Sequence, residues 1–96
     1  MEVEFTDADL DRLETDAKFT AGYGTEIIRG FRKAMQSIRA ADDERDLFLL
    51  RGLGFEKLKG ARQHQCSVRL NKQWRLILEL SGPPKKVCII GIEDYH

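Results

Sequence analysis

The stretch "QCSVRLNKQWRLILEL", residues 65–80, decides the fold, because apolar and polar side chains alternate along it on both sides of a short polar break. A strand keeps its register by holding its apolar side chains on one face, since a slip of one residue inverts every side chain. A three-residue loop, 71–73, then pairs Leu70 with Trp74 and predicts an antiparallel hairpin. The apolar face of this hairpin comprises Cys66, Val68, Leu70, Trp74, Leu76, Leu78 and Leu80.

The same register places Arg69 directly opposite Arg75 on the other face. Like charges opposed across a ladder destabilise a sheet, so the pair needs an explanation. One interpretation is an anion site, because the planar guanidinium can donate two parallel hydrogen bonds to a phosphate. On that interpretation, Arg75→Ala leaves stability unchanged or raises it. The other interpretation is that Glu79 or another carboxylate neutralises the pair.

The segments before the hairpin predict one strand and two helices. "VEF", residues 3–5, alternates as a short strand does. Thr6 and Asp9 fit a capping box at the start of the first helix. The apolar residues of that helix are Leu10, Leu13 and Ala17. Thr25 can cap a second helix that runs to Ala40. The apolar stripe of the second helix comprises Ile27, Ile28, Phe31, Ala34, Met35 and Ile38.

After a polar break at 40–46, the period of the pattern changes from helical to alternating. "KKVCIIGI", residues 85–92, predicts a last strand, and the two prolines in "SGPPKK" exclude regular structure in the connection before it. The predicted fold is therefore α+β, with an N-terminal strand, two helices and then an antiparallel sheet that includes a C-terminal strand. No repeat or linker interrupts it, so residues 1–96 are expected to form a single domain.

The composition is that of an ordinary globular chain, with 42% hydrophobic and 33% charged residues. The start, "MEVEF", is acidic and does not resemble a secretion signal. The longest apolar run, "VCIIGI", is far too short to span a membrane. We therefore expect a cytoplasmic protein without a membrane partner, in which Cys66 and Cys88 are reduced thiols in strands.

Charge is unevenly distributed along a chain whose formal net charge is zero. Residues 1–48 hold twelve acids and seven bases, and residues 49–96 hold four acids and nine bases. A run without any acid contains the bases Lys57, Lys59, Arg62, Arg69, Lys72 and Arg75. Such a basic half can attract a polyanion, although a solvated basic surface would show the same charge count.

Groups that can transfer protons gather in the same basic half, namely Glu56, His64, Asp94, Tyr95 and His96. Cleavage of a phosphodiester by proton transfer needs a base, an acid and cations that stabilise the charged intermediate. RNA supplies its own nucleophile, the 2′-hydroxyl, so no metal or other cofactor is expected. A zinc site formed by His64 and His96 with the two cysteines is excluded, because "HQC" is not a usual ligand spacing and no C-x-x-C pair is present.

The motifs "FEKLKG" at 55–60, "SVRLN" at 67–71, "QWRL" at 73–76 and "DYH" at 94–96 resemble the RelE/ParE superfamily of toxins from bacterial toxin–antitoxin pairs, and most closely its HigB branch. The resemblance is strong over roughly the last 45 residues. Departures from the family pattern fall at Ala61, His64 and Cys66, in and beside one loop. The resemblance implies the RelE-like fold and a ribosome-dependent endoribonuclease that cleaves mRNA.

The resemblance also implies roles for individual residues. Lys59 and Arg75 match the family's transition-state cations, and His96 matches its terminal histidine. Asp94 and Tyr95 match an acid and a tyrosine that hold this histidine or stack on a base. At Glu56 some relatives carry a general base. We accordingly expect the catalytic residues to be Glu56, Lys59, Arg75, Asp94, Tyr95 and His96, and the substrate-binding residues to be Lys57, Arg62, Arg69 and Trp74.

The partners that the resemblance implies are the ribosome, mRNA and a cognate helix-turn-helix antitoxin of the HigA type. An alternative within the same fold is a toxin that is not a nuclease and acts by binding, as the ParE branch does on DNA gyrase. Glu56, Arg75 and His96 favour the nuclease, because a protein that only binds has no reason to assemble them.

Overall fold

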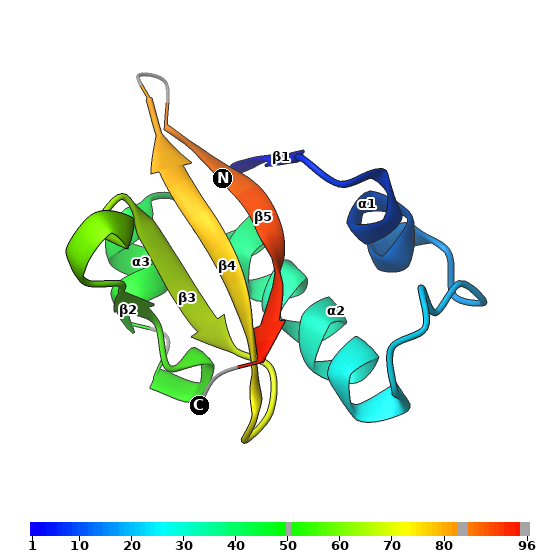
Figure 1. The fold of residues 1–96 in the computed structure, drawn as a ribbon. Helices are drawn as coiled ribbons and strands as arrows, with labels where there is room; N and C mark the ends of the chain where they lie inside the picture. Colours follow the sequence, from blue (N-terminus) through cyan, green and yellow to red (C-terminus); the bar gives the residue numbers. More distant parts are fainter. Residues whose placement is uncertain (50, 83–84, 95–96) are drawn as a thin grey trace.

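In the computed structural model, which describes residues 1–49, 51–82 and 85–94, a five-stranded sheet forms the centre of the fold (Figure 1). The strand order is β1-β5-β4-β3-β2. β1 (Glu2–Phe5) pairs in parallel with β5 (Lys86–Asp94), and every other neighbouring pair is antiparallel. The remaining strands are β2 (Glu56–Lys57), β3 (Gln65–Arg69) and β4 (Trp74–Ser81).

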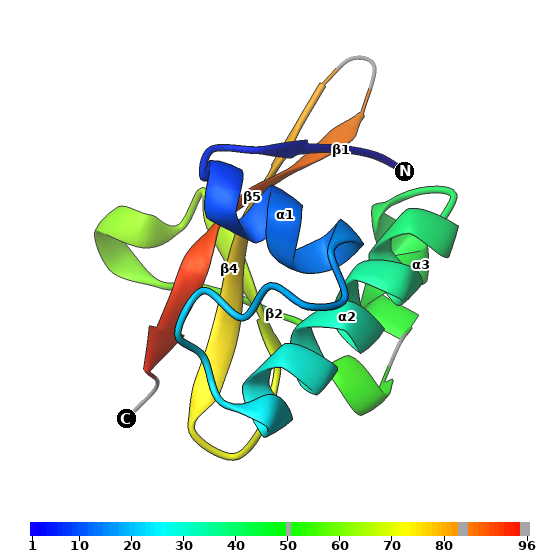
Figure 2. The ribbon, with the colours of Figure 1, turned by 90° about the vertical axis from the view of Figure 1, so that its right-hand side faces the viewer.

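Helices α2 (Thr25–Ala40) and α3 (Glu44–Leu49) lie behind the sheet in Figure 1, and α1 (Ala8–Thr15) packs beside α2. The short 3-10 helices are η1 (Arg51–Leu53) and η2 (Gly60–Arg62). Figure 2 shows η2 on the opposite side of the sheet from α2. We call this second side, which carries the candidate site, the site face. The core between sheet and helices includes Leu10, Leu13, Phe31, Met35, Ile38, Leu47, Val68, Leu76, Leu78, Val87 and Ile89.

The hairpin has the predicted register. Val68 pairs with Leu76 and Arg69 pairs with Arg75. The Asn71 carboxamide closes the turn, because its Oδ1 accepts hydrogen bonds from the backbone N–H groups of Gln73 (2.8 Å) and Trp74 (2.7 Å). The α+β prediction, with an N-terminal strand, two long helices and a C-terminal strand in the sheet, is confirmed.

Several local predictions differ from the structure. Asp7 rather than Thr6 caps α1, and its Oδ1 accepts a hydrogen bond from Asp9 N–H at 2.8 Å. The Thr6 hydroxyl instead donates to the Ile89 carbonyl in β5, at 3.1 Å. α1 ends at Thr15, so Ala17 lies outside it and is exposed. α2 has the predicted bounds, but its N-cap is Gly24 and Thr25 is its first residue.

A third helix, α3, was not predicted. It begins at Glu44, inside the polar stretch that was interpreted as a break, and it sends Leu47 into the core with 0% exposure. β2 and the parallel pairing of β1 with β5 were also not predicted, because each involves a strand of four residues or fewer. Among the described residues, no helix is long and apolar enough to span a bilayer.

Both cysteines lie in strands as free thiols, as predicted, but not equally deep. Cys66 is buried on the helix side of β3, and Cys88 is half-buried in β5. β4 lies between these two strands, and Cys88 pairs with Glu79 on the site face. The two thiols therefore lie on opposite faces of the sheet, which excludes a bridge between them in this fold.

Candidate active site

Arg75 is the buried centre of the site face. Its side chain is only 6% exposed, although strand alternation directs it away from the hydrophobic core. Its Nε donates a hydrogen bond to the Ser67 hydroxyl at 2.8 Å, and its Nη2 donates to the Gly54 carbonyl. A buried guanidinium that is held by neighbours on two different segments has little freedom to reorient. Its charge is therefore fixed in one place before any ligand arrives.

The two opposed arginine side chains are held by different surroundings. The hydrogen bonds to Ser67 and Gly54 draw the Arg75 guanidinium inward, whereas Arg69 is exposed and lies against the backbone of Gly54. A carboxylate from elsewhere also faces Arg75, because Glu56 Oε1 lies 3.5 Å from Arg75 Nη2. The carboxylate is Glu56 and not Glu79, whose side chain contacts His64 and Gln65 instead.

Glu56 reaches Arg75 from the edge strand β2, where it pairs with Ser67 of β3. Its side chain is 49% exposed, so the carboxylate contacts both the buried cation and solvent. A substrate proton can therefore reach it. Lys59 is exposed just before η2. Glu56 and Lys59 line one cavity of about 310 Å³ along this edge, together with Lys57 and Leu58. The structure thus brings together a carboxylate, a buried guanidinium and an exposed ammonium.

Arg62 on η2 is tied to β5 by a bidentate ion pair. Its Nη1 and Nη2 donate to the two carboxylate oxygens of Glu93 at 2.9 and 2.7 Å, and its Nε donates to Gln65 Oε1 at 2.9 Å. The hydrogen bonds from Arg62 lower the pKa of Glu93, and Glu93 in turn raises the pKa of Arg62. The predicted substrate-binding cation therefore has a carboxylate partner in this structure, which holds η2 over the site face.

A bulge in β5 gives Glu93 this position. Ile77 pairs with Gly91 and Leu78 pairs with Ile89, so Ile90 is an extra residue between them. The extra residue shifts the alternation of the strand, as a bulge does. As a result Ile89 enters the core while Glu93, four residues later, pairs with Arg75 on the site face. Without the bulge, residues on one side of it would point to the wrong face.

At the end of β5, Asp94 pairs with Trp74 and accepts a hydrogen bond from Gln73 Nε2 at 3.0 Å. This bond ties the last described residue to the β3–β4 turn. The predicted tyrosine and general acid, Tyr95 and His96, lie outside the described residues. The strand that carries them therefore ends one residue beyond Glu93, at the edge of the site face.

Two predicted substrate-binding residues lie on the other side of the sheet. Lys57 pairs with Cys66, which faces the core, and its Nζ lies 5.8 Å from the centroid of the Phe48 ring in α3. Trp74 packs against the core on the helix side. Each of the two residues directly adjoins one that reaches the site face. Trp74 does not join Arg75 and Glu56, whereas Lys57 lines the cavity beside Glu56.

Sequence reasoning missed the residues that hold the cations in place, namely Gly54, Ser67 and Glu93. Only Ser67 had a signal. The hairpin pattern put it on the face of Arg69, where a small hydroxyl beside Arg75 could have been inferred as its acceptor. Gly54 contributes only a carbonyl oxygen, and Glu93 depends on a bulge, so neither has a side-chain pattern to find.

Comparisons with known proteins bear on the family and the fold of the chain. A family model described as "RelE-like toxin of type II toxin-antitoxin system HigB" matches residues 3–96. Toxin HigB-1 of Vibrio cholerae is 34% identical over 79 residues, which cover 82% of this chain and 83% of that protein. Among solved structures, a YoeB/ParE toxin from Agrobacterium tumefaciens has a TM-score of 0.63 at 21% identity, with both chains fully covered. The YoeB–YefM complex from Staphylococcus aureus gives a TM-score of 0.61 at 20% identity, covering 100% of this chain and 97% of that one.

Proposed function

This chain belongs to the HigB-like family of RelE-like toxins from type II toxin–antitoxin systems, and from that membership and the geometry of the site face we propose that it is an endoribonuclease that cleaves mRNA on translating ribosomes. The single observation that carries the proposal is the pairing of a buried, hydrogen-bonded Arg75 with the half-exposed carboxylate of Glu56, 3.5 Å apart. A preorganised cation beside an accessible base is what phosphodiester cleavage by proton transfer requires.

In the proposed mechanism, Glu56 accepts the proton of the RNA 2′-hydroxyl as the 2′-oxygen attacks the adjacent phosphorus. A bond from the phosphorus to the 2′-oxygen forms, and the bond to the 5′-oxygen of the next nucleotide breaks. His96 donates a proton to that leaving oxygen. Arg75 and Lys59 stabilise the negative charge that develops on the phosphoryl oxygens. The reaction needs no metal and no other cofactor, because the nucleophile belongs to the substrate.

The remaining predicted residues have supporting roles. Asp94 and Tyr95 hold or orient His96, and Arg69 binds the phosphate chain next to Arg75. Arg62 has a carboxylate partner, so it binds RNA only when the phosphate replaces Glu93. Lys57 lines the cavity of Glu56 and Lys59 and can bind RNA there, whereas Trp74 packs against the core on the helix side.

A few cations and a small site bind RNA electrostatically but do not select a codon unaided. We therefore propose that the ribosome presents the mRNA, and that the protein acts in the cytoplasm. A cognate antitoxin is expected from membership in a toxin–antitoxin family. We propose a helix-turn-helix antitoxin of the HigA type as this partner.

The test compares cleavage of one mRNA on purified translating ribosomes with cleavage of the same mRNA alone. Wild-type protein should cut the transcript on ribosomes and leave free RNA almost intact. Glu56→Gln should reduce the rate by about 10²- to 10⁴-fold, the usual contribution of a general base. The matched control is Glu26→Gln, which removes an exposed acid from the first turn of α2.

Two outcomes would overturn the proposal. In the first, free transcripts are cut as fast as ribosome-bound ones. In the second, cells that express the protein stop growing with intact transcripts and inhibited DNA gyrase, which would show that the toxin acts by binding alone.

A further inference from the structure

A groove of about 330 Å³ lies between α2 and the segments that surround the end of β3. Its floor includes Leu53 and Leu70, which are 7% and 8% exposed. Gly30, Lys33 and Ser37 line one wall from α2, where spacings of three and four residues put them on one face. Gly52, Arg69 and Asn71 complete the lining. No acid is among these lining residues.

The groove depends on a direct approach of α2 to the hairpin backbone. A Cβ on Gly30 would lie 3.1 Å from Leu70 Cα and closer still to the Leu70 carbonyl oxygen. Only a glycine permits this approach, which carries Lys33, one helical turn later, to the same groove as Arg69.

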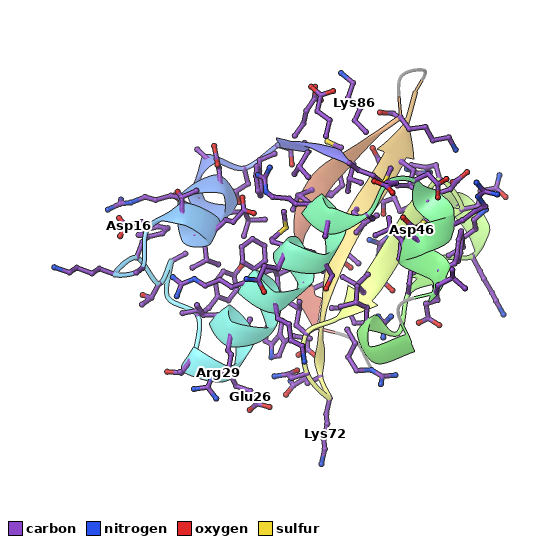
Figure 3. All side chains as sticks on the ribbon, turned by 180° about the vertical axis from the view of Figure 1, so that it is seen from behind. Asp16, Glu26, Arg29, Asp46, Lys72 and Lys86 are labelled. Atoms are coloured by element: carbon purple, nitrogen blue, oxygen red, sulfur yellow. The ribbon has the colours of Figure 1, made fainter. Side chains whose placement is uncertain are left out.

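Among the described residues, the two cations of the groove have no carboxylate partner. Within the described residues, seven of the sixteen lysines and arginines form ion pairs, namely Arg12, Arg39, Arg45, Arg62, Arg75, Lys85 and Lys86. Within residues 1–49, 51–82 and 85–94, neither Lys33 nor Arg69 has an acid within ion-pair distance. Figure 3 shows two more cations, Arg29 and Lys72, at the same end of the molecule, together with the acid Glu26. An acid-free groove with unpaired cations favours an anionic ligand.

Arg69 connects the groove to the candidate active site. Its guanidinium lies about 3.4 Å from where a Cβ of Gly54 would be, and the Gly54 carbonyl accepts the hydrogen bond of Arg75. Arg69 and Arg75 are also partners across the β3–β4 ladder. Arg69 therefore lies at the end of β3, between the groove, which has α2 as one wall, and the site face that carries Arg75.

We propose that this groove is a second nucleotide subsite for single-stranded RNA, with a phosphate next to the scissile one held between Lys33 and Arg69. The apolar floor of Leu53 and Leu70 accommodates the sugar or base, and the Ser37 hydroxyl lies in reach of the same nucleotide. The subsite rests on the proposed function, since it extends the path of the RNA substrate. Its new element is Lys33 of α2, which has no part in the chemistry.

The test measures binding of an RNA oligonucleotide that carries 2′-O-methyl groups throughout. This probe lacks the nucleophile, so the intact wild-type chain can be used. Lys33→Gln should weaken binding about two- to fivefold at low salt. It should also reduce the slope of log K against log salt by about 0.7, the value for one phosphate contact on a single strand. The matched control is Lys18→Gln, which removes an exposed lysine after α1 and should leave the slope at the wild-type value.

The proposal is overturned if Lys33→Gln and Lys18→Gln bind the probe alike. It is also overturned if Lys33→Gln slows cleavage on ribosomes while probe binding matches the control, because the groove would then contact ribosomal RNA. Failure of the proposed nuclease function would appear separately, as mRNA left uncut by the wild-type chain whatever the behaviour of Lys33→Gln.

Discussion

Arg75→Ala should destabilise the fold, although opposed arginines in a sheet suggested the contrary. The substitution leaves the Ser67 hydroxyl, which is 0% exposed, without the donor that binds it at 2.8 Å. It also leaves the Gly54 carbonyl without its hydrogen bond from Arg75. An unsatisfied buried polar group costs about 1–3 kcal/mol, and the relief of repulsion from Arg69 returns about 1 kcal/mol at most. Loss of the interaction between Arg75 and Glu56 should lower the stability little, because the Glu56 side chain is 49% exposed and water can solvate its carboxylate.

Two such groups cost about 2–6 kcal/mol, so the net loss in the free energy of unfolding should be about 1–5 kcal/mol. Each kcal/mol lowers the Tm of a domain this size by about 4–8 °C. Thermal unfolding followed by circular dichroism measures it. Arg69→Ala is the matched control from the same ladder pair, and it should change stability by less than about 0.5 kcal/mol because Arg69 is exposed. The double variant Arg75→Met, Ser67→Ala should recover part of the loss, since it removes both partners. A Tm for Arg75→Ala at or above the wild-type value would refute this reasoning.

Three further predictions concern packing, pH and thiol reactivity. Gly30→Ala should cost about 1–3 kcal/mol in thermal unfolding, because the new methyl group collides with the Leu70 backbone, whereas Gly52→Ala, with open space around its Cβ position, should be nearly neutral. The ion pair with Arg62 lowers the pKa of Glu93 in the folded state below its ordinary value of 4.5, so it stabilises the fold above that value, and this stability is lost as the pH falls through the lower folded pKa. Between pH 6 and 3 the Tm of the wild type should therefore fall by more than the Tm of Glu93→Gln. Equal decreases would contradict the ion pair. Burial raises the pKa of both thiols, so both should react slowly at pH 8. Because Cys88 is only half-buried and Cys66 is buried, a thiol reagent should label Cys88 first in the native protein. The reverse order would contradict this difference in burial.

The hairpin could be predicted from the sequence because one constraint determines it. Apolar side chains had to share a face, and this alone paired Val68 with Leu76 and Arg69 with Arg75. The stripe on α2 was equally clear, because its spacing is helical over sixteen residues. By contrast, α3 is six residues long and has one fully buried side chain, Leu47, which is too little periodicity to recognise among acids.

The site could be predicted as a set of charges but not as a network. Motif and charge pattern identified Glu56 and Arg75, and the structure places them 3.5 Å apart. Side chains alternate between the two faces of a strand, so the face of a residue follows from its position in this alternation. β2 has only two residues, which is too few to show the alternation in the sequence. For this reason the face of the sheet to which Lys57 belongs could not be predicted from the sequence. The pairing of Arg62 with Glu93 depends on the extra residue Ile90, which shifts the alternation of side chains along β5. Neither the composition nor any sequence motif indicates this shift.

The central claim is that Glu56 and Arg75 act on a phosphodiester that is attacked by its own 2′-hydroxyl. The most direct measurement identifies the ends of mRNA fragments produced by the purified protein on translating ribosomes. Attack by the 2′-oxygen must leave a 2′,3′-cyclic phosphate, or the 3′-phosphate derived from it, on one fragment and a 5′-hydroxyl on the other. We predict these ends, and their absence when Glu56→Gln replaces the wild type. Fragments with a 3′-hydroxyl and a 5′-phosphate would contradict the account, because water and not the 2′-hydroxyl would then be the nucleophile.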